Sequence, residues 1–124
     1  MEPAKKLLLI EDDLYTRELY ENILGDAGFE VATAEDGEDG LAKSEMGGFS
    51  IILLDLVMPK MDGIQFLSAY SNGSVKDKNG PVVVFTNLAH DPVIRQAIKL
   101  GAKGYIIKSD LTPEQLIKEV GSYI

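Results

Sequence analysis

Five polar residues stand directly after apolar runs of the sequence, and their types suit chemistry on a phosphoryl group. Glu11 and Asp12 follow the first such run, Asp55 follows the third, Thr86 the fourth and Lys108 the last. If these runs are parallel strands, their carboxyl ends meet at one edge of the sheet, where open α/β sheets bind ligands. We therefore expect the five side chains to converge on one site.

Three carboxylates that are packed together repel one another, and each disfavours ionisation of the next unless a cation neutralises them. Mg²⁺ suits such a site because it takes oxygen ligands from one or two carboxylates, from water and from phosphate. The Lys108 ammonium and the Thr86 hydroxyl are donors of the kind that stabilise phosphoryl oxygens. The set predicts a Mg²⁺-dependent phosphoryl-transfer site in which an Asp is the acceptor.

Other polar residues near these runs carry a simpler interpretation. Asp13 and Asp62 are read as helix caps or turn residues, because a single acid at the end of a strand most often has that role. His90 has no second His or Cys to complete a metal site and is read as a loop residue.

Composition narrows the class of protein. The 124 residues fit one compact soluble domain, and the net charge of −8 argues against a nucleic-acid surface, which needs clustered Lys and Arg. The chain contains no Cys, which excludes thiol nucleophiles and zinc-thiolate sites. Its apolar runs are far shorter than the ~20 residues that span a bilayer, so we expect no membrane segment and a cytoplasmic protein.

The elements that must position the polar residues can be read from the apolar pattern. The five strand candidates are rich in Val, Ile and Leu: Leu7 to Ile10, Phe29 to Ala32, Ile51 to Leu54, Val82 to Phe85 and Tyr105 to Ile107. Segments with apolar residues at helical spacing lie between them. Asp91 and Thr112 each precede a proline as capping residues, and Ser71 to Gly80 is read as a surface loop.

Strands one, three and four are continuously apolar, which is typical of strands covered on both faces. Alternating strands and helices therefore predict a doubly wound, flavodoxin-like α/β fold. Its five-stranded parallel sheet is expected in the order 2-1-3-4-5, with helices on both faces, and residues 1–124 are expected to form a single domain with its core at about 5–124.

Four segments together resemble the receiver domain of two-component response regulators. They are the motif ending in Glu11-Asp12-Asp13, the stretch from Leu54 to Gly63 (LDLVMPKMDG), Val84-Phe85-Thr86, and the stretch from Gly101 to Lys108 (GAKGYIIK). The resemblance implies a phosphoacceptor that promotes only its own phosphorylation and dephosphorylation, rather than a true enzyme. Its donor would be a sensor histidine kinase or a phosphotransfer protein.

The resemblance also assigns roles to individual residues. It implies that Asp55 is the phosphoacceptor and that Glu11, Asp12, Asp55 and the backbone carbonyl of Val57 hold Mg²⁺. Thr86 and Lys108 would engage the phosphoryl group. Tyr105 resembles the aromatic whose rotamer follows activation, and the surface around it would bind a downstream protein; its simpler interpretation is a half-buried strand aromatic. A dimer on phosphorylation is compatible with this picture.

The sequence departs from the family pattern at two positions. Asn87 stands where the family has a small residue, and Ser109 stands where it has a cis proline, so we expect a trans Lys108–Ser109 peptide. The side chains of Val57 and Leu88 are expected near the path of the water that hydrolyses the acyl phosphate. Neither can hydrogen-bond that water, which predicts a long-lived phosphorylated state.

Three alternatives are weaker. A phosphatase of the haloacid dehalogenase type needs a second acid two residues after its Asp, where this chain has Val57. A flavodoxin-like cofactor carrier needs Gly, Ser and Thr in its first loop, where Glu11 and the two acids after it would repel a flavin phosphate. A degenerate receiver that only binds partners would not need all five site residues.

Overall fold

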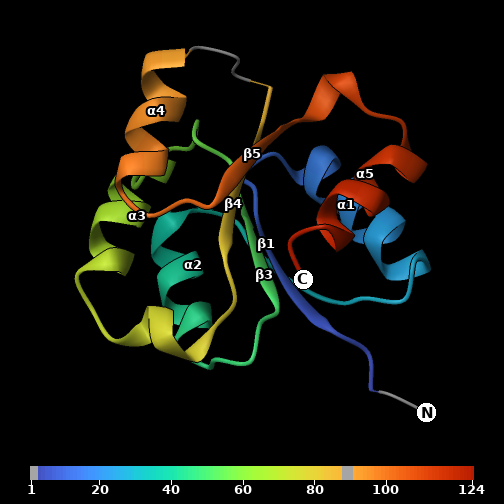
Figure 1. The fold of residues 1–124 in the computed structure, drawn as a ribbon, viewed down its shortest axis with the longest axis horizontal. Coiled ribbons are helices and arrows are strands. Elements are labelled where there is room, and N and C mark those ends of the chain that lie inside the picture. Colours follow the sequence, from blue (N-terminus) through green and yellow to red (C-terminus); the bar gives the residue numbers. More distant parts are fainter. Residues whose placement is uncertain (1–2, 88–90) are drawn as a thin grey trace.

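The computed structural model of the chain describes residues 3–87 and 91–124, which form one five-stranded parallel sheet covered by helices on both faces (Figure 1). The strand order β2-β1-β3-β4-β5 confirms the predicted topology. The elements in chain order are β1 Lys6–Ile10, α1 Leu14–Asp26, β2 Glu30–Ala34, α2 Gly37–Ser44, β3 Ile51–Leu54, α3 Gly63–Ser71, the 3₁₀ helix η1 Val75–Lys78, β4 Val82–Thr86, α4 Asp91–Lys99, β5 Gly104–Ile107, the 3₁₀ helix η2 Lys108–Asp110, and α5 Pro113–Gly121.

Two apolar layers enclose the sheet. Side chains of α3 and α4, with Leu41 of α2, pack on one face, where Leu8, Ile52 and Val84 point. Side chains of α1 and α5 pack on the other face against the alternate strand residues, among them Leu9 and Leu53. β3 and β4 are buried along their length and β1 is buried from Leu7 onward, which explains why their sequences are unbroken apolar runs.

The helix boundaries follow from local capping. The Asp13 side chain accepts from Thr16 N at the start of α1, and Asp62 and Thr112 each form a capping box with the Gln three residues later. The prediction that Asp13 and Asp62 are caps is therefore confirmed. Gly28 and Gly101 adopt positive φ angles of 102° and 113° just after α1 and α4. Glycine enters this region of backbone conformation most easily.

Several predicted boundaries were wrong by one or two residues. β2 runs to Ala34 rather than Ala32, because it continues to pair with β1 as far as Ile10. β4 includes Thr86, which pairs with Ile107 in the register of β5. The expected cap Asp91 is already the first residue of α4, and the segment expected to be a loop after Ser71 contains η1.

No helix among residues 3–87 and 91–124 is long and apolar enough to cross a membrane.

Candidate functional site

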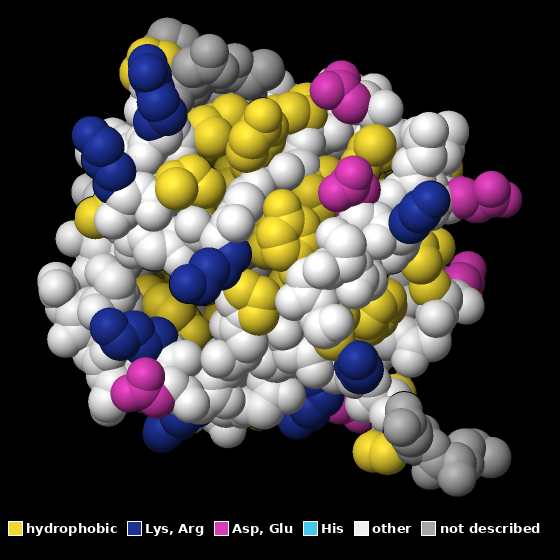
Figure 2. All heavy atoms as spheres, viewed as in Figure 1, with side chains coloured by type: hydrophobic (Ala, Val, Ile, Leu, Met, Phe, Trp, Pro, Cys, Tyr) yellow, Lys and Arg dark blue, Asp and Glu magenta, His cyan; other side chains and the backbone are white. Residues whose placement is uncertain are grey.

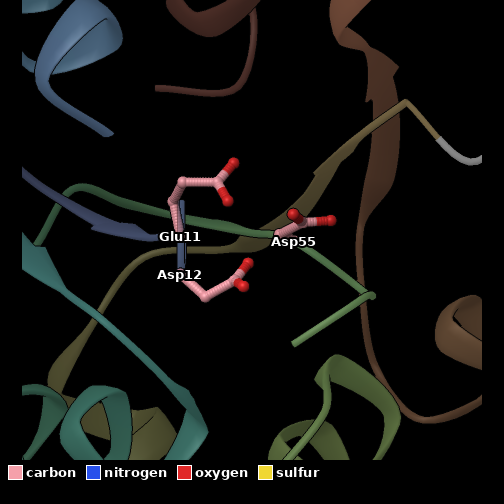
Figure 3. Close-up of side chains that lie close together, drawn as sticks. All are labelled: Glu11, Asp12 and Asp55. Atoms are coloured by element: carbon pink, nitrogen blue, oxygen red, sulfur yellow. The ribbon is translucent and has the colours of Figure 1, made fainter. Parts of the chain in front are cut away.

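Three carboxylates meet beyond the carboxyl ends of β1 and β3. One ligand oxygen from each of Glu11, Asp12 and Asp55 can be chosen so that all three lie within 4.8 Å of one another. Figure 3 shows the three side chains close together at the ends of the two strands. These three carboxylates could hold a Mg²⁺ ion, which prefers oxygen ligands from carboxylates and water. The predicted proximity of the three acids is confirmed.

The strand register creates this proximity. Ile10 and Leu54 are partners in the parallel ladder, so the next residue of each strand emerges at the same level of the sheet. The backbone N–H of Asp55 donates to the carbonyl of Ile10 at 3.1 Å, which continues the pairing for one more residue. Two strands that are otherwise apolar thus end in acids side by side.

A lysine that follows the edge strand β5 neutralises part of this charge. The Lys108 ammonium forms an ion pair with Glu11 Oε1 and lies 3.3 Å from Asp55 Oδ2. Its side chain is only 5% exposed, and the ammonium lies 5.3 Å from the centroid of the Phe85 ring. A buried cation that bridges two buried carboxylates compensates their desolvation better than either pair would alone.

Burial raises the pKa of Glu11 above its usual range. The Lys108 ammonium opposes this shift through a hydrogen bond and its charge, whereas the nearby Asp55 carboxylate adds to it. The backbone N–H of Asp13 also donates to Glu11 Oε2 at 3.2 Å. At Glu11, burial thus outweighs the compensation that the Lys108 ammonium and the Asp13 N–H give to the carboxylate.

Asp55 is the acid that faces both the acidic pair and the lysine. The residue is 8% exposed, and its Oδ1 accepts a hydrogen bond from the Val57 N–H at 3.3 Å while Oδ2 faces Lys108. Val57 is 61% exposed, so it takes no part in the core. Asp12 is exposed, so water and small ions reach the cluster from that side.

The backbone of the loop between β3 and α3 is tightly constrained beside Asp55. Lys60 adopts a positive φ of 61°, and its ammonium lies 3.8 Å from Asp36 Oδ2. A positive φ is uncommon for a residue with a side chain. A Cβ on Gly63 would lie 2.6 Å from the Asp55 carbonyl oxygen, so only glycine allows α3 to begin this close to the strand.

Two other predicted site residues, Thr86 and Tyr105, lie on the neighbouring strands β4 and β5. Thr86 is buried at the end of β4, one residue beyond the level of Asp55, and Tyr105 on β5 is 53% exposed. Tyr105 pairs with Val84, below the acidic cluster rather than in it. Asn87 is exposed, the Lys108–Ser109 peptide is trans as expected, and the predicted roles of Leu88 and His90 lie outside the described residues.

Sequence reasoning missed two contributors to the site. The Arg17 side chain in α1 donates hydrogen bonds to the backbone carbonyls of Glu11 at 2.8 Å and Asp12 at 3.3 Å. These bonds hold the backbone of the two acids in place. The sequence feature that could have indicated this contact is a basic residue one turn after the helix cap Asp13. A long side chain at that position can reach back to the preceding loop. Phe85 was read as a strand residue only, although its ring also faces the Lys108 ammonium.

Comparisons with known proteins agree with this geometry. The family model of the response regulator receiver domain matches residues 7–121. The chemotaxis protein CheY of Treponema pallidum is 34% identical over 122 residues, which cover 96% of this chain and 82% of that protein.

Solved structures are similar over nearly the whole chain. The chemotaxis protein CheY4 of Vibrio cholerae matches with a TM-score of 0.86 and 30% identity, covering 98% of this chain and 99% of that one. A chain from the CheX-CheY-BeF3-Mg+2 complex of Borrelia burgdorferi matches with a TM-score of 0.83 and 28% identity, covering 95% and 87%. The matches favour the receiver over the phosphatase and flavodoxin-like alternatives.

Proposed function

Because this chain belongs to the response regulator receiver family, we propose that Asp55 accepts a phosphoryl group from a histidine kinase or phosphotransfer protein in a Mg²⁺-dependent reaction. The observation that carries this proposal is the position of Asp55, which lies between an acidic pair and a buried lysine at the end of a central strand. In the transfer, an Asp55 carboxylate oxygen attacks phosphorus, the P–N bond to the donor imidazole breaks, and the imidazole leaves with its electron pair.

The acidic residues would hold the ion. Glu11, Asp12 and Asp55, together with the backbone carbonyl of Val57, offer the oxygen ligands that Mg²⁺ prefers. When bound, Mg²⁺ neutralises the charge that accumulates between these carboxylates and the phosphoryl oxygens. Arg17 fixes the backbone of the Glu11-Asp12 loop, so that the two acids are positioned before the phosphoryl group arrives.

Two further side chains would engage the phosphorylated Asp55. Lys108 already contacts an Asp55 oxygen, so its ammonium can follow the charge onto the phosphoryl group with little movement. Thr86, at the end of the neighbouring strand, would donate its hydroxyl to a phosphoryl oxygen. The protein promotes only its own phosphorylation and dephosphorylation in this scheme and turns over no separate substrate.

The output would be a change in protein binding. We place the downstream contact on the surface around Tyr105, whose half-exposed ring would change rotamer when Thr86 moves toward the phosphoryl group. The Borrelia relative, solved in a complex with CheX, BeF3 and Mg²⁺, supports binding of this kind. The receiver domain would span the sheet and its helices from about residue 5 to 124 and act in the cytoplasm.

Intact-mass spectrometry tests the proposal. The wild-type protein, incubated with acetyl phosphate and Mg²⁺, should gain one phosphoryl group, and the gain should disappear when EDTA removes the ion. Asp55→Asn should gain none. An equal gain in Asp55→Asn, or in the presence of EDTA, would contradict the proposal.

A further inference from the structure

A cavity lies at the opposite end of the sheet from Asp55. It has a volume of about 470 Å³ and is bounded by the last turns of α3, by η1 and the segment leading to β4, and by the residues after α4. This volume is in the range of small-molecule sites, roughly 300 to 1,000 Å³. We refer to it as the η1 cavity.

The inner wall of the η1 cavity is apolar. Leu67 and Tyr70 of α3, Val82 at the start of β4, and Leu100 after α4 line it. Leu67, Tyr70 and Val82 are at most 5% exposed and belong to the main core cluster, so this wall is fixed by the packing of the protein. A preformed apolar wall favours a ligand with an apolar body.

The rim of the η1 cavity carries two ammonium groups, from Lys76 and Lys103. Within residues 3–87 and 91–124 neither of them forms an ion pair; Lys76 donates one hydrogen bond, to the Ser71 carbonyl at 3.2 Å. Asp77 also lines the cavity and offsets one of the two positive charges. The rim therefore keeps a net positive charge that a single anion would neutralise.

The half of the chain that supplies the η1 cavity is slightly basic, although the protein as a whole is acidic. Residues 1–62 contain 15 acidic and 5 basic side chains, whereas residues 63–124 contain 5 acidic and 7 basic ones. Figure 2 shows dark-blue side chains gathered over α3, α4 and the segment between α3 and β4, with yellow apolar surface between them. The basic side chains around the cavity thus favour an anion there more than the acidic half of the chain does.

A buried phenol adds a directional donor. The Tyr70 hydroxyl accepts a hydrogen bond from Asn79 Nδ2 at 3.3 Å, and no acceptor for its own proton is found in the described part of the chain. Burial raises the pKa of Tyr70, so the phenol keeps this proton at neutral pH. A hydroxyl has one proton to donate and can still accept, so it can serve Asn79 and a ligand at once.

We propose that the η1 cavity binds a small organic anion, with its apolar body against Leu67, Val82 and Leu100 and its carboxylate between Lys76, Lys103 and the Tyr70 hydroxyl. These three residues line the same cavity from three different parts of the fold, so the ligand would tie η1 to the ends of α3 and α4. The site lies away from the acidic cluster, so the proposal stands independently of the phosphorylation of Asp55.

Ligand fluorescence provides the test. Because the protein has no Trp, indole-3-acetate can be excited without background from protein indole. We expect saturable binding of indole-3-acetate with a dissociation constant below about 1 mM, and at least tenfold weaker binding of neutral indole-3-acetamide, which has the same body. Equal binding of the two compounds, or no saturation, would overturn the proposal.

Matched variants locate the site. Lys76→Gln/Lys103→Gln should weaken indole-3-acetate binding at least tenfold. Lys5→Gln/Lys118→Gln removes the same charge from exposed positions that do not line the cavity and should change binding less than twofold. Tyr70→Phe, checked for folding by circular dichroism, should weaken the acid more than the amide. Equal losses in the two double variants would show that net charge, rather than this cavity, governs binding.

Discussion

The interiors of β1 and β3 are apolar, whereas the residues that directly follow these strands are charged. Leu7 to Ile10 and Ile51 to Leu54 are at most 1% exposed and entirely aliphatic, and their burial stabilises the fold. One residue further on, Glu11 and Asp55 are nearly as buried but charged, with Lys108 between them. The strands thus supply apolar burial, whereas their carboxyl ends gather charge at one edge of the sheet.

The largest expected effect belongs to the strand interior. Leu8→Ala in β1, where Leu8 is fully buried, should lower the free energy of unfolding by about 2–5 kcal/mol, because it removes buried contacts and leaves a cavity. Leu19 is 53% exposed. Leu19→Ala, the same change at an exposed position, should therefore cost less than about 0.5 kcal/mol. Urea denaturation measures both. The comparison fails if Leu8→Ala, while folded, also weakens Mg²⁺ binding more than twofold.

The carboxyl end should show the reverse pattern. Asp12→Ala should weaken Mg²⁺ binding at least tenfold, about 1.4 kcal/mol, while the free energy of unfolding without Mg²⁺ stays the same or rises, because like charges are separated. Titration calorimetry measures the affinity. Asp13→Asn removes one negative charge at the adjacent residue and keeps a good helix cap, so it should change Mg²⁺ affinity far less than Asp12→Ala does. Similar losses in both variants would mean that only overall charge matters.

A smaller effect concerns the lifetime of the phosphorylated state. Val57 is 61% exposed beside the Asp55 carboxylate and cannot hydrogen-bond an attacking water. Val57→Asn should speed the loss of phosphate severalfold after the donor is removed, because the amide can orient that water. Val57→Ile keeps an apolar side chain and should leave the rate near that of the wild type. If the Asn variant is no faster, this side chain does not control the rate.

The smallest expected effect is a loss of folding stability at high pH, caused by two tyrosines in the apolar layers. Burial raises the pKa of both Tyr70 and Tyr123 in the folded protein. The unfolded chain therefore loses these protons first, so stability is full below the unfolded pKa of about 10 and falls as the pH rises above it. Tyr70→Phe should lose less stability than the wild type between about pH 9 and about pH 11. An identical decline in both proteins would remove Tyr70 as a cause.

Much of the architecture could be predicted because it depends on local patterns. Continuous apolar runs identified the buried parallel strands, and the alternation of strands with helices gave the order 2-1-3-4-5. The end of β2 was misjudged because Thr33 and Ala34 belong to an edge strand, where pairing with β1 rather than composition decides the length. η1 was missed because its Lys-Asp-Lys sequence resembles a loop.

The site was only partly accessible from sequence. The proximity of Glu11, Asp12 and Asp55 followed from the rule that parallel strands end together. The pairing of Lys108 with Glu11 as well as Asp55, and the contact of Arg17 with two backbone carbonyls, depend on side-chain directions in three dimensions. The η1 cavity likewise combines residues from separate parts of the fold, and no local pattern predicted it.

Locating the phosphoryl group within the chain tests the central claim most directly. Borohydride reduction converts an aspartyl phosphate to homoserine, and trypsin separates residues 44–60, whose only acids are Glu45 and Asp55, from residues 7–17, which contain Glu11, Asp12 and Asp13. Tandem mass spectrometry after phosphorylation with Mg²⁺ should find homoserine at position 55 and at no other acid. Homoserine at position 12 or 13 would contradict the account.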